Sequence, residues 1–333
     1  MRIHGGPDQA GVPTHDFSTN SNACGPSPHA LAVVEQADPR QYPDAAYTGL
    51  RQQLAGFHQV DAHRIVLAAS ASEFIFRITA LVARRGGRSV SLPLHGYGDY
   101  AQAARACEME PVGAEADAPL RWGCDPSSPQ GLVDERLQSL VTTKAHGDIL
   151  VLDRAYEPLR LEGALALTKT RLQSVWQLWT PNKALGLTGV RAAYAIAPLD
   201  SDVDVQAMEA LCPSWPVGSH GVAMLQAWTQ PEVQAWLAGS LHILRQWKTR
   251  QLAMCDTMGW RCEDSQANFF CAQPALPDGK SLTDVLGSLR EYGIKVRDTT
   301  SFGLPGGVRV SVQSPEAQHA LHNAWQAITG KTA

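Results

Sequence analysis

Long apolar runs and large blocks of one charge are missing from this sequence. No stretch approaches the roughly 18 apolar residues of a membrane-spanning helix, and the start, MRIHGGPDQAG, lacks the hydrophobic segment of a signal peptide. Charged residues make up 18% of the chain, the net charge is −4, and no block of like charge reaches five residues. We therefore expect a cytoplasmic protein with no membrane partner and no nucleic-acid partner.

Cysteine and histidine are present without the spacing of a metal site. The seven cysteines are scattered, none in a C-x-x-C pair, and their odd number argues against a disulfide framework. His319 and His322 share one face of an expected helix, which is too few ligands for zinc. The glycine patterns of Rossmann and P-loop enzymes are absent as well. The sequence predicts no metal site.

Alternating periodicities predict the class of the fold. The chain has 333 residues, of which 44% are hydrophobic, enough to bury a core in each of about two domains. Helical spacing of apolar residues occurs at 45–57, 71–84 and 97–107. Short apolar strands occur at 64–68, 89–93, 148–153, 174–179 and 191–196. This alternation predicts an α/β protein whose sheet is covered by helices on both faces.

The second half of the chain predicts a linking region and a smaller lobe. Residues 216–258 have long amphipathic stretches, typical of helices that connect two lobes. Strand, helix, strand and helix patterns then follow at 268–272, 281–293, 308–312 and 315–328. Because this piece is short for an independent unit, we expect it to pack with the N-terminus. The prediction is a large domain of residues 31–230 and a discontinuous small domain of residues 1–30 and 231–333.

One segment places a lysine and an arginine close together after a strand. In WTPNKALGLTGVR, Lys183 follows the strand that ends at Trp179, and Arg191 lies eight positions further on. A partly desolvated lysine can lose its proton near neutral pH and react with an aldehyde, and arginine is suited to a phosphate. A lone lysine is more often a solvated surface residue, so the interpretation depends on the segments upstream.

The segment resembles the Schiff-base segment of the class I/II aminotransferases, which are pyridoxal-phosphate enzymes of fold type I. Further segments follow the order of that family: S-A-S-E at 70–73, Y-G-D-Y at 97–100, C-D-P-S-S-P-Q-G at 124–131 and D-R-A-Y at 153–156. The resemblance covers residues 16–313. It implies a large domain with a mostly parallel sheet of the seven-stranded type covered by helices, and a small α/β domain from both termini. It also implies pyridoxal 5'-phosphate as the cofactor.

The resemblance implies a role for each matching residue. Lys183 would bond to the cofactor and act as a base, Asp153 would face the pyridine nitrogen, and Tyr156 would hydrogen-bond the ring's 3-hydroxyl. The other expected cofactor contacts are Ala71 and Ser72 at a helix N-terminus, Tyr97 stacked on the ring, Ser128, Thr180 and Arg191. An ordinary serine cap and a helix-capping aspartate are the structural alternatives.

Ser128 departs from the family pattern. The segment 124–131 resembles N-P-N-N-P-T-G, whose asparagine reaches the ring hydroxyl, and Ser128 takes the place of that asparagine. A serine hydroxyl still donates a hydrogen bond but has a shorter reach. The electronic tuning of the ring, and with it the type of reaction, is therefore open.

The resemblance also implies a substrate side and a second subunit. Arg309, in V-R-V-S-V, falls where the family binds a substrate carboxylate, for which the planar guanidinium is suited. Arg297 is either a second substrate contact or a surface residue. Tyr42, in Y-P-D, resembles the tyrosine that crosses to the cofactor phosphate of the neighbouring subunit. We therefore expect a homodimer that acts on a small-molecule amino acid.

The N-terminus indicates a branch of the family. His4-Gly5-Gly6 and D-F-S-T-N-S-N-A-C-G-P at 16–26 resemble motifs of the threonine-phosphate decarboxylases of cobalamin biosynthesis, although Ala23 replaces the usual proline. His4 and Asn22 are then expected substrate contacts, and a frayed terminus is the alternative for His4. Histidinol-phosphate aminotransferases share everything downstream. Transamination is therefore the alternative reaction.

Overall fold

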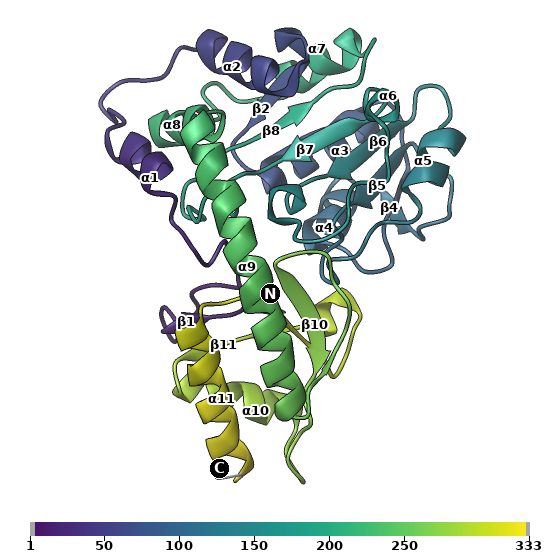
Figure 1. The fold of residues 1–333 in the computed structure, drawn as a ribbon. Helices are drawn as coiled ribbons and strands as arrows, with labels where there is room; N and C mark the ends of the chain where they lie inside the picture. Colours follow the sequence, from purple (N-terminus) through teal and green to yellow (C-terminus); the bar gives the residue numbers. More distant parts are fainter. Residues whose placement is uncertain (1–3, 331–333) are drawn as a thin grey trace.

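A seven-stranded sheet forms the centre of the upper lobe of the computed structural model, which describes residues 4–330 (Figure 1). In spatial order its strands are β2 (Ile65–Ala68), β8 (Ala193–Ile196), β7 (Trp176–Trp179), β6 (Ile149–Asp153), β5 (Leu120–Cys124), β3 (Ser89–Ser91) and β4 (Glu110–Val112). Neighbours from β7 to β4 are parallel, and β8 is antiparallel to both of its neighbours. The predicted mostly parallel sheet is confirmed.

Both faces of the sheet are buried at β2 and β8, which explains why these two strands are continuously apolar. Along β8, Ala193 and Ala195 face one hydrophobic cluster, whereas Tyr194 and Ile196 face another. Helices α3 (Ala71–Arg84), α4 (Gly98–Ala106) and α7 (Asp202–Ala210) cover the first face. Helices α1 (Pro28–Glu35), α2 (Thr48–His58), α8 (Ser219–Trp228) and the first half of α9 (Pro231–Thr257) cover the second. The short helices α5 (Leu137–Thr143) and α6 (Lys169–Leu172) pack a smaller cluster.

The lower lobe combines both ends of the chain, and α9 runs from the upper lobe into it (Figure 1). An antiparallel sheet has the order β12 (Arg297–Asp298), β13 (Val308–Ser311), β10 (Phe269–Gln273) and β9 (Arg261–Cys262), beside α10 (Leu282–Glu291) and α11 (Pro315–Thr329). From the N-terminal segment, β1 (His15–Asp16) pairs in parallel with β11 (Ile294–Lys295). Phe17 is consequently buried in the same core as Phe270 and Trp325.

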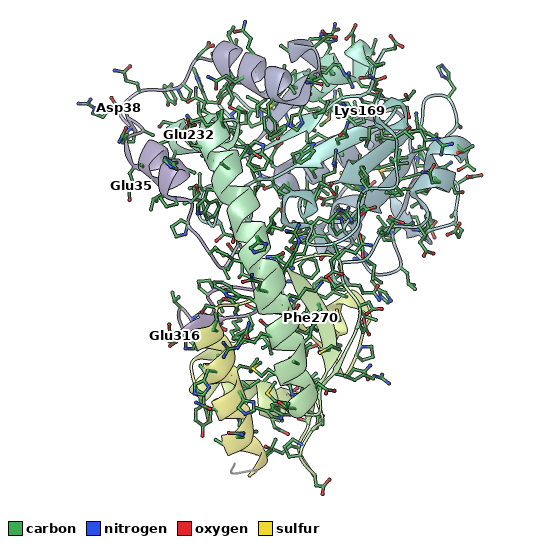
Figure 2. The ribbon with its side chains drawn as sticks, in the orientation of Figure 1. Glu35, Asp38, Lys169, Glu232, Phe270 and Glu316 are labelled. Atoms are coloured by element: carbon green, nitrogen blue, oxygen red, sulfur yellow. The ribbon has the colours of Figure 1, made fainter. Side chains whose placement is uncertain are left out.

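Charged side chains lie on the surface of the protein, and large apolar side chains lie in its interior. Glu35, Asp38 and Glu316 project outward in Figure 2, whereas Phe270 lies inside the lower lobe. Among the described helices, none is both long and apolar enough to cross a membrane. The division into domains at residues 30 and 230 stays a prediction, and its residues 1–3 and 331–333 lie outside the described part of the chain.

Candidate active site

A cavity of about 1070 Å³ opens where β5, β6 and β7 end. The lower lobe contributes Arg297, Phe302 and Arg309 to its wall, and the N-terminal segment contributes residues 4–5 and 18–20. The expected site residues that line it are His4, Ala71, Ser72, Tyr97, Ser128, Asp153, Tyr156, Thr180, Lys183, Arg191 and Arg309. Folding therefore brings these residues together from both lobes, at the strand ends where α/β sheets bind ligands.

Asp153, the last residue of β6, forms the floor of the cavity. Its carboxylate is buried, and each oxygen accepts one hydrogen bond: Oδ2 from the Tyr100 hydroxyl at 2.5 Å and Oδ1 from the Ala155 amide at 2.9 Å. Burial raises the pKa of Asp153 above its ordinary value, and the two hydrogen bonds and the Lys183 charge oppose that shift. A buried carboxylate of this kind gains most from a cationic partner in the cavity.

Lys183 lies on the loop that follows β7. Its Nζ is 5.2 Å from the centroid of the Tyr156 ring, and both residues line the cavity. Asn22 supports this loop from behind: its backbone amide donates to the Lys183 carbonyl at 2.9 Å, and its Nδ2 donates to Ala184 O at 3.0 Å. Asn22 is therefore not part of the cavity wall, although a substrate contact was expected of it.

The start of α3 forms one end of the cavity. Ala71 and Ser72 are the first residues of the helix, so their amide groups have no acceptor within it and can bind an anion. Arg191 lines the same cavity and adds a positive charge. The Tyr97 hydroxyl lies 3.2 Å from Ser72 Oγ, and burial raises the pKa of Tyr97 to about 12.

Asn20 lies beside Tyr156 and was missed from the sequence. Its Nδ2 donates to the Tyr156 hydroxyl at 3.2 Å, and its Oδ1 is buried with no partner in the described structure. Asn20 and Asn22 belong to one motif, and no local pattern indicates which of them faces the cavity. Ser128, in turn, accepts a hydrogen bond from Arg309 at 3.3 Å.

Two buried arginines face the cavity from the lower lobe. Arg309 donates to Ser128 Oγ and to the Ser18 carbonyl, and Arg297 donates to Ser301 Oγ at 2.7 Å. Their guanidinium carbons lie 5.4 Å and 4.9 Å from the Phe302 ring centroid. Burial, and after it the charge of Arg309, lowers the pKa of Arg297. The positive charges of Arg297 and Arg309 repel each other, and an anion bound between them would relieve this repulsion.

The remaining expected residues occupy different surroundings. His4 is exposed at the mouth of the cavity, with its ring centroid 6.2 Å from that of Tyr97. Thr180 is buried and donates to Asn182 Oδ1 at 2.9 Å. Tyr42 is 78% exposed, stacks on Trp215 and lies outside the cavity of its own chain. Its contact to a second subunit stays a prediction.

The residues present fit pyridoxal 5'-phosphate. The cavity offers an amine at Lys183, a buried carboxylate at Asp153 for a protonated ring nitrogen, and a helix N-terminus with Arg191 for the phosphate. Among residues 4–330, no three histidine, cysteine, aspartate or glutamate side chains gather to hold a metal ion.

The sequence of this chain is similar to those of known enzymes. Residues 122–323 match the family model of aminotransferase class I and II. The histidinol-phosphate aminotransferase of Jannaschia sp. (strain CCS1) is 26% identical over 322 residues, which cover 90% of this chain and 87% of the relative.

Two solved structures share the fold. The histidinol-phosphate aminotransferase of Sinorhizobium meliloti, in complex with pyridoxal-5'-phosphate, has a TM-score of 0.79 and 21% identity, covering 94% of this chain and 90% of that one. The L-threonine-O-3-phosphate decarboxylase of Porphyromonas gingivalis has a TM-score of 0.72 and 21% identity, covering 94% and 97%.

The chain belongs to the aminotransferase class I and II family, because the family model matches more than half of it. It is thus a member of a family of pyridoxal-phosphate-dependent enzymes, and the fold type I architecture and the cofactor expected from the sequence are confirmed.

Proposed function

We propose that this enzyme decarboxylates a phosphorylated amino acid, as a threonine-phosphate decarboxylase of cobalamin biosynthesis does. The observation that carries the proposal is the joint position of Arg297, Arg309 and His4 on the cavity that also contains Lys183. A substrate with both a phosphate and a carboxylate supplies two anionic groups to the two arginines and to the hydrogen-bonding ring of His4. O-phosphothreonine has that chemistry.

The N-terminal segment supports the same choice. His4 and Gly5 belong to the H-G-G motif, Ser18 and Asn20 to the D-F-S-x-N motif, and all four line the cavity. Asp8 ties the segment to the lower lobe through ion pairs with Arg290 at 3.1 Å and Lys295 at 2.7 Å. The two motifs that resemble the decarboxylase branch therefore both contribute residues to the cavity wall, which supports the proposal.

The chain's own groups have distinct tasks in this proposal. Pyridoxal phosphate, held by the residues described above, would supply an electron-withdrawing ring that stabilises the electron pair left on the substrate α-carbon when a bond to that carbon breaks. Asp153 stays ionised beside the ring nitrogen, and the Lys183 amine moves a proton at the α-carbon. Arg309 holds the substrate carboxylate and so selects the bond that is aligned for cleavage. Tyr156, supported by Asn20, hydrogen-bonds the ring hydroxyl.

Transamination of histidinol phosphate is the second candidate. The curated relatives named histidinol-phosphate aminotransferase, such as that of Jannaschia, favour it. In that reaction the phosphate of one substrate and the carboxylates of a keto acid would use the same arginines in turn. The two candidates differ in their need for a keto acid, because a transaminase must return its cofactor to the aldehyde form.

One pair of incubations tests the proposal. The enzyme is given O-phospho-L-threonine alone and, separately, histidinol phosphate with 2-oxoglutarate, and CO2 and glutamate are measured. We expect CO2 from the first mixture without any keto acid and no glutamate from the second. Glutamate formation without CO2 release would overturn the proposal in favour of the aminotransferase.

A further inference from the structure

Tyr100 is a buried phenol at the cavity floor to which the proposed reaction assigns no task. It lies in the first turn of α4 and is 1% exposed. Its ring stacks on Trp122 of β5, with the centroids 4.3 Å apart and the planes 17° apart. A phenylalanine would make the same stack. Only the hydroxyl group reaches Asp153 Oδ2, at 2.5 Å.

The direction of this hydrogen bond follows from the groups that face Asp153. These are Tyr100 from α4, Cys124 from the end of β5 and Lys183 from the loop after β7. Burial and the neighbouring Asp153 charge raise the pKa of both Tyr100 and Cys124 well above their ordinary values. Both therefore stay protonated at neutral pH, and the carboxyl of Asp153 is the acid that ionises. Tyr100 is thus the donor and the Asp153 carboxylate the acceptor.

We propose that Tyr100 is a positioning residue that keeps Asp153 ionised and oriented toward the ring nitrogen of the cofactor. The Ala155 amide holds Oδ1 and the Tyr100 hydroxyl holds Oδ2, which fixes the plane of the carboxylate. Each oxygen keeps a further lone pair for the protonated ring. Charge-assisted hydrogen bonds of this length stabilise the ionised form against the burial that opposes it. The inference rests on the role proposed for Asp153.

The test replaces the hydroxyl alone, with Tyr100→Phe in the full-length holoenzyme. We expect the dissociation constant of pyridoxal phosphate to rise about tenfold, and kcat to fall with little change in KM for the substrate. Because the Asp153 pKa rises in the variant, the pH at which acidification releases half of the cofactor moves upward. Cofactor release is followed by absorbance after dialysis at a series of pH values.

Tyr194→Phe is the matched control. Tyr194 is also fully buried, stacks on Trp179 with the planes 5° apart, and its hydroxyl accepts a hydrogen bond from Trp228 at 3.0 Å in the cluster on the other face of the sheet. The Tyr194→Phe variant loses a hydroxyl group that is as buried as that of Tyr100 but makes no contact with Asp153. We expect its cofactor affinity at neutral pH, where His58 beside Tyr194 does not titrate, to match that of the unaltered enzyme.

The variant Asp153→Asn tests separately whether Asp153 is the partner of the ring nitrogen, which is the role on which the inference about Tyr100 rests. Unaltered cofactor affinity in Asp153→Asn would remove that role. Weak affinity in Asp153→Asn, with Tyr100→Phe indistinguishable from Tyr194→Phe, would overturn the inference alone. If Tyr100→Phe does not fold, the unaltered holoenzyme provides the test: we expect a far-downfield proton resonance from the Tyr100 hydrogen bond that disappears in Asp153→Asn, and its absence would overturn the inference.

Discussion

The environment of an aspartate decides what its charge does in this protein. Asp8 is solvent-exposed, and hydrogen bonds from Arg290 and then from Lys295 lower its pKa below the ordinary range. Such exposed pairs contribute little to stability, although they hold the N-terminal segment in place. Asp153 is buried, and its pKa is raised. The same side chain thus serves as a surface tether at one position and as a partner for a buried cation at the other.

Lys183 is expected to carry the cofactor. Borohydride reduction of the holoenzyme followed by peptide mapping should place the label on Lys183, because its amine lines the cavity opposite Tyr156. Lys183→Ala should abolish labelling and activity. Lys169→Ala, at the start of α6 on the surface in Figure 2, should leave both unchanged. A label on any other lysine would contradict this assignment.

At the scale of elements, Ser70 has two roles, because it caps the N-terminus of α3 and also lines the cavity. Ser70 Oγ accepts a hydrogen bond from the Glu73 amide at 3.1 Å, and Ser70 itself lines the cavity. Ser70→Ala should lower the free energy of unfolding by about 1 kcal/mol and also weaken cofactor binding, because the helix N-terminus frays.

A second capped helix provides the control for this prediction. Ser281 caps α10 in the lower lobe, where its Oγ accepts from the Asp284 amide at 3.2 Å. Ser281→Ala should cost about as much stability, roughly 1 kcal/mol, with no change in cofactor affinity. Denaturant unfolding and cofactor titration of both variants give the comparison. Equal cofactor affinity in the two would refute the dual role of Ser70.

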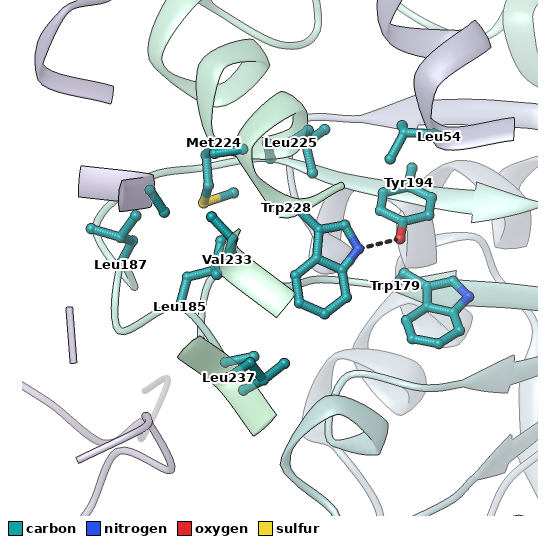
Figure 3. Close-up of a cluster of buried hydrophobic side chains, with 14 of the residues drawn as sticks. Leu54, Trp179, Leu185, Leu187, Tyr194, Met224, Leu225, Trp228, Val233 and Leu237 are labelled. Carbon is teal, nitrogen blue, oxygen red and sulfur yellow. Dashed lines mark hydrogen bonds between the residues drawn. The ribbon is translucent and has the colours of Figure 1, made fainter. Parts of the chain in front are cut away.

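The helices α2 and α8 meet β8 in a buried polar contact. Trp228 donates to the Tyr194 hydroxyl at 3.0 Å, the bond drawn dashed in Figure 3, and His58 Nε2 lies 2.8 Å from the same oxygen. Because the Tyr194 oxygen accepts from Trp228, its own proton remains available to the Nε2 atom of a neutral His58. Burial, with a contribution from the charge of Arg154, lowers the pKa of His58 to about 3.

This contact makes stability depend on pH in a defined window. Between about pH 6.5 and pH 3, the unfolded chain binds a proton at His58 that the folded protein does not. The free energy of unfolding should therefore fall on acidification in this range, by at most about 1.4 kcal/mol per pH unit from this group. His58→Gln, which keeps a polar group without titrating, should flatten the slope by about one proton. Identical slopes in urea unfolding would contradict this.

At the scale of the whole molecule, the cavity lies between the lobes and Tyr42 lies outside it. We expect a dimer in sedimentation velocity, in which Tyr42 reaches the cavity of the partner subunit. Tyr42→Phe should preserve the dimer and weaken cofactor binding, whereas Tyr292→Phe, at the exposed end of α10, should change neither. A strictly monomeric protein with full activity would refute the role of Tyr42.

The sequence alone determined the elements whose patterns are local. The helix predicted at 71–84 coincides with α3, because its apolar face and its serine cap both lie within the segment. Strand β5, Leu120–Cys124, was not predicted because Arg121 and Gly123 interrupt its apolar run. Arg121 is buried in this strand, where ion pairs with Asp117 and Asp148 compensate its charge. Asp148 comes close to Arg121 only because β5 pairs with β6.

The family motifs predicted the lysine, the aspartate and the cofactor, because each motif is a short run of adjacent residues. The tertiary structure decided which neighbours support them. Asn20 rather than Asn22 faces the cavity, where it contacts Tyr156, 136 positions further along the chain. Tyr100 holds Asp153 over a separation of 53 positions, and Arg309 contacts Ser128 over a separation of 181 positions. Such contacts leave no periodic trace in the sequence, because they exist only after the sheet has formed and the two ends of the chain have packed against it.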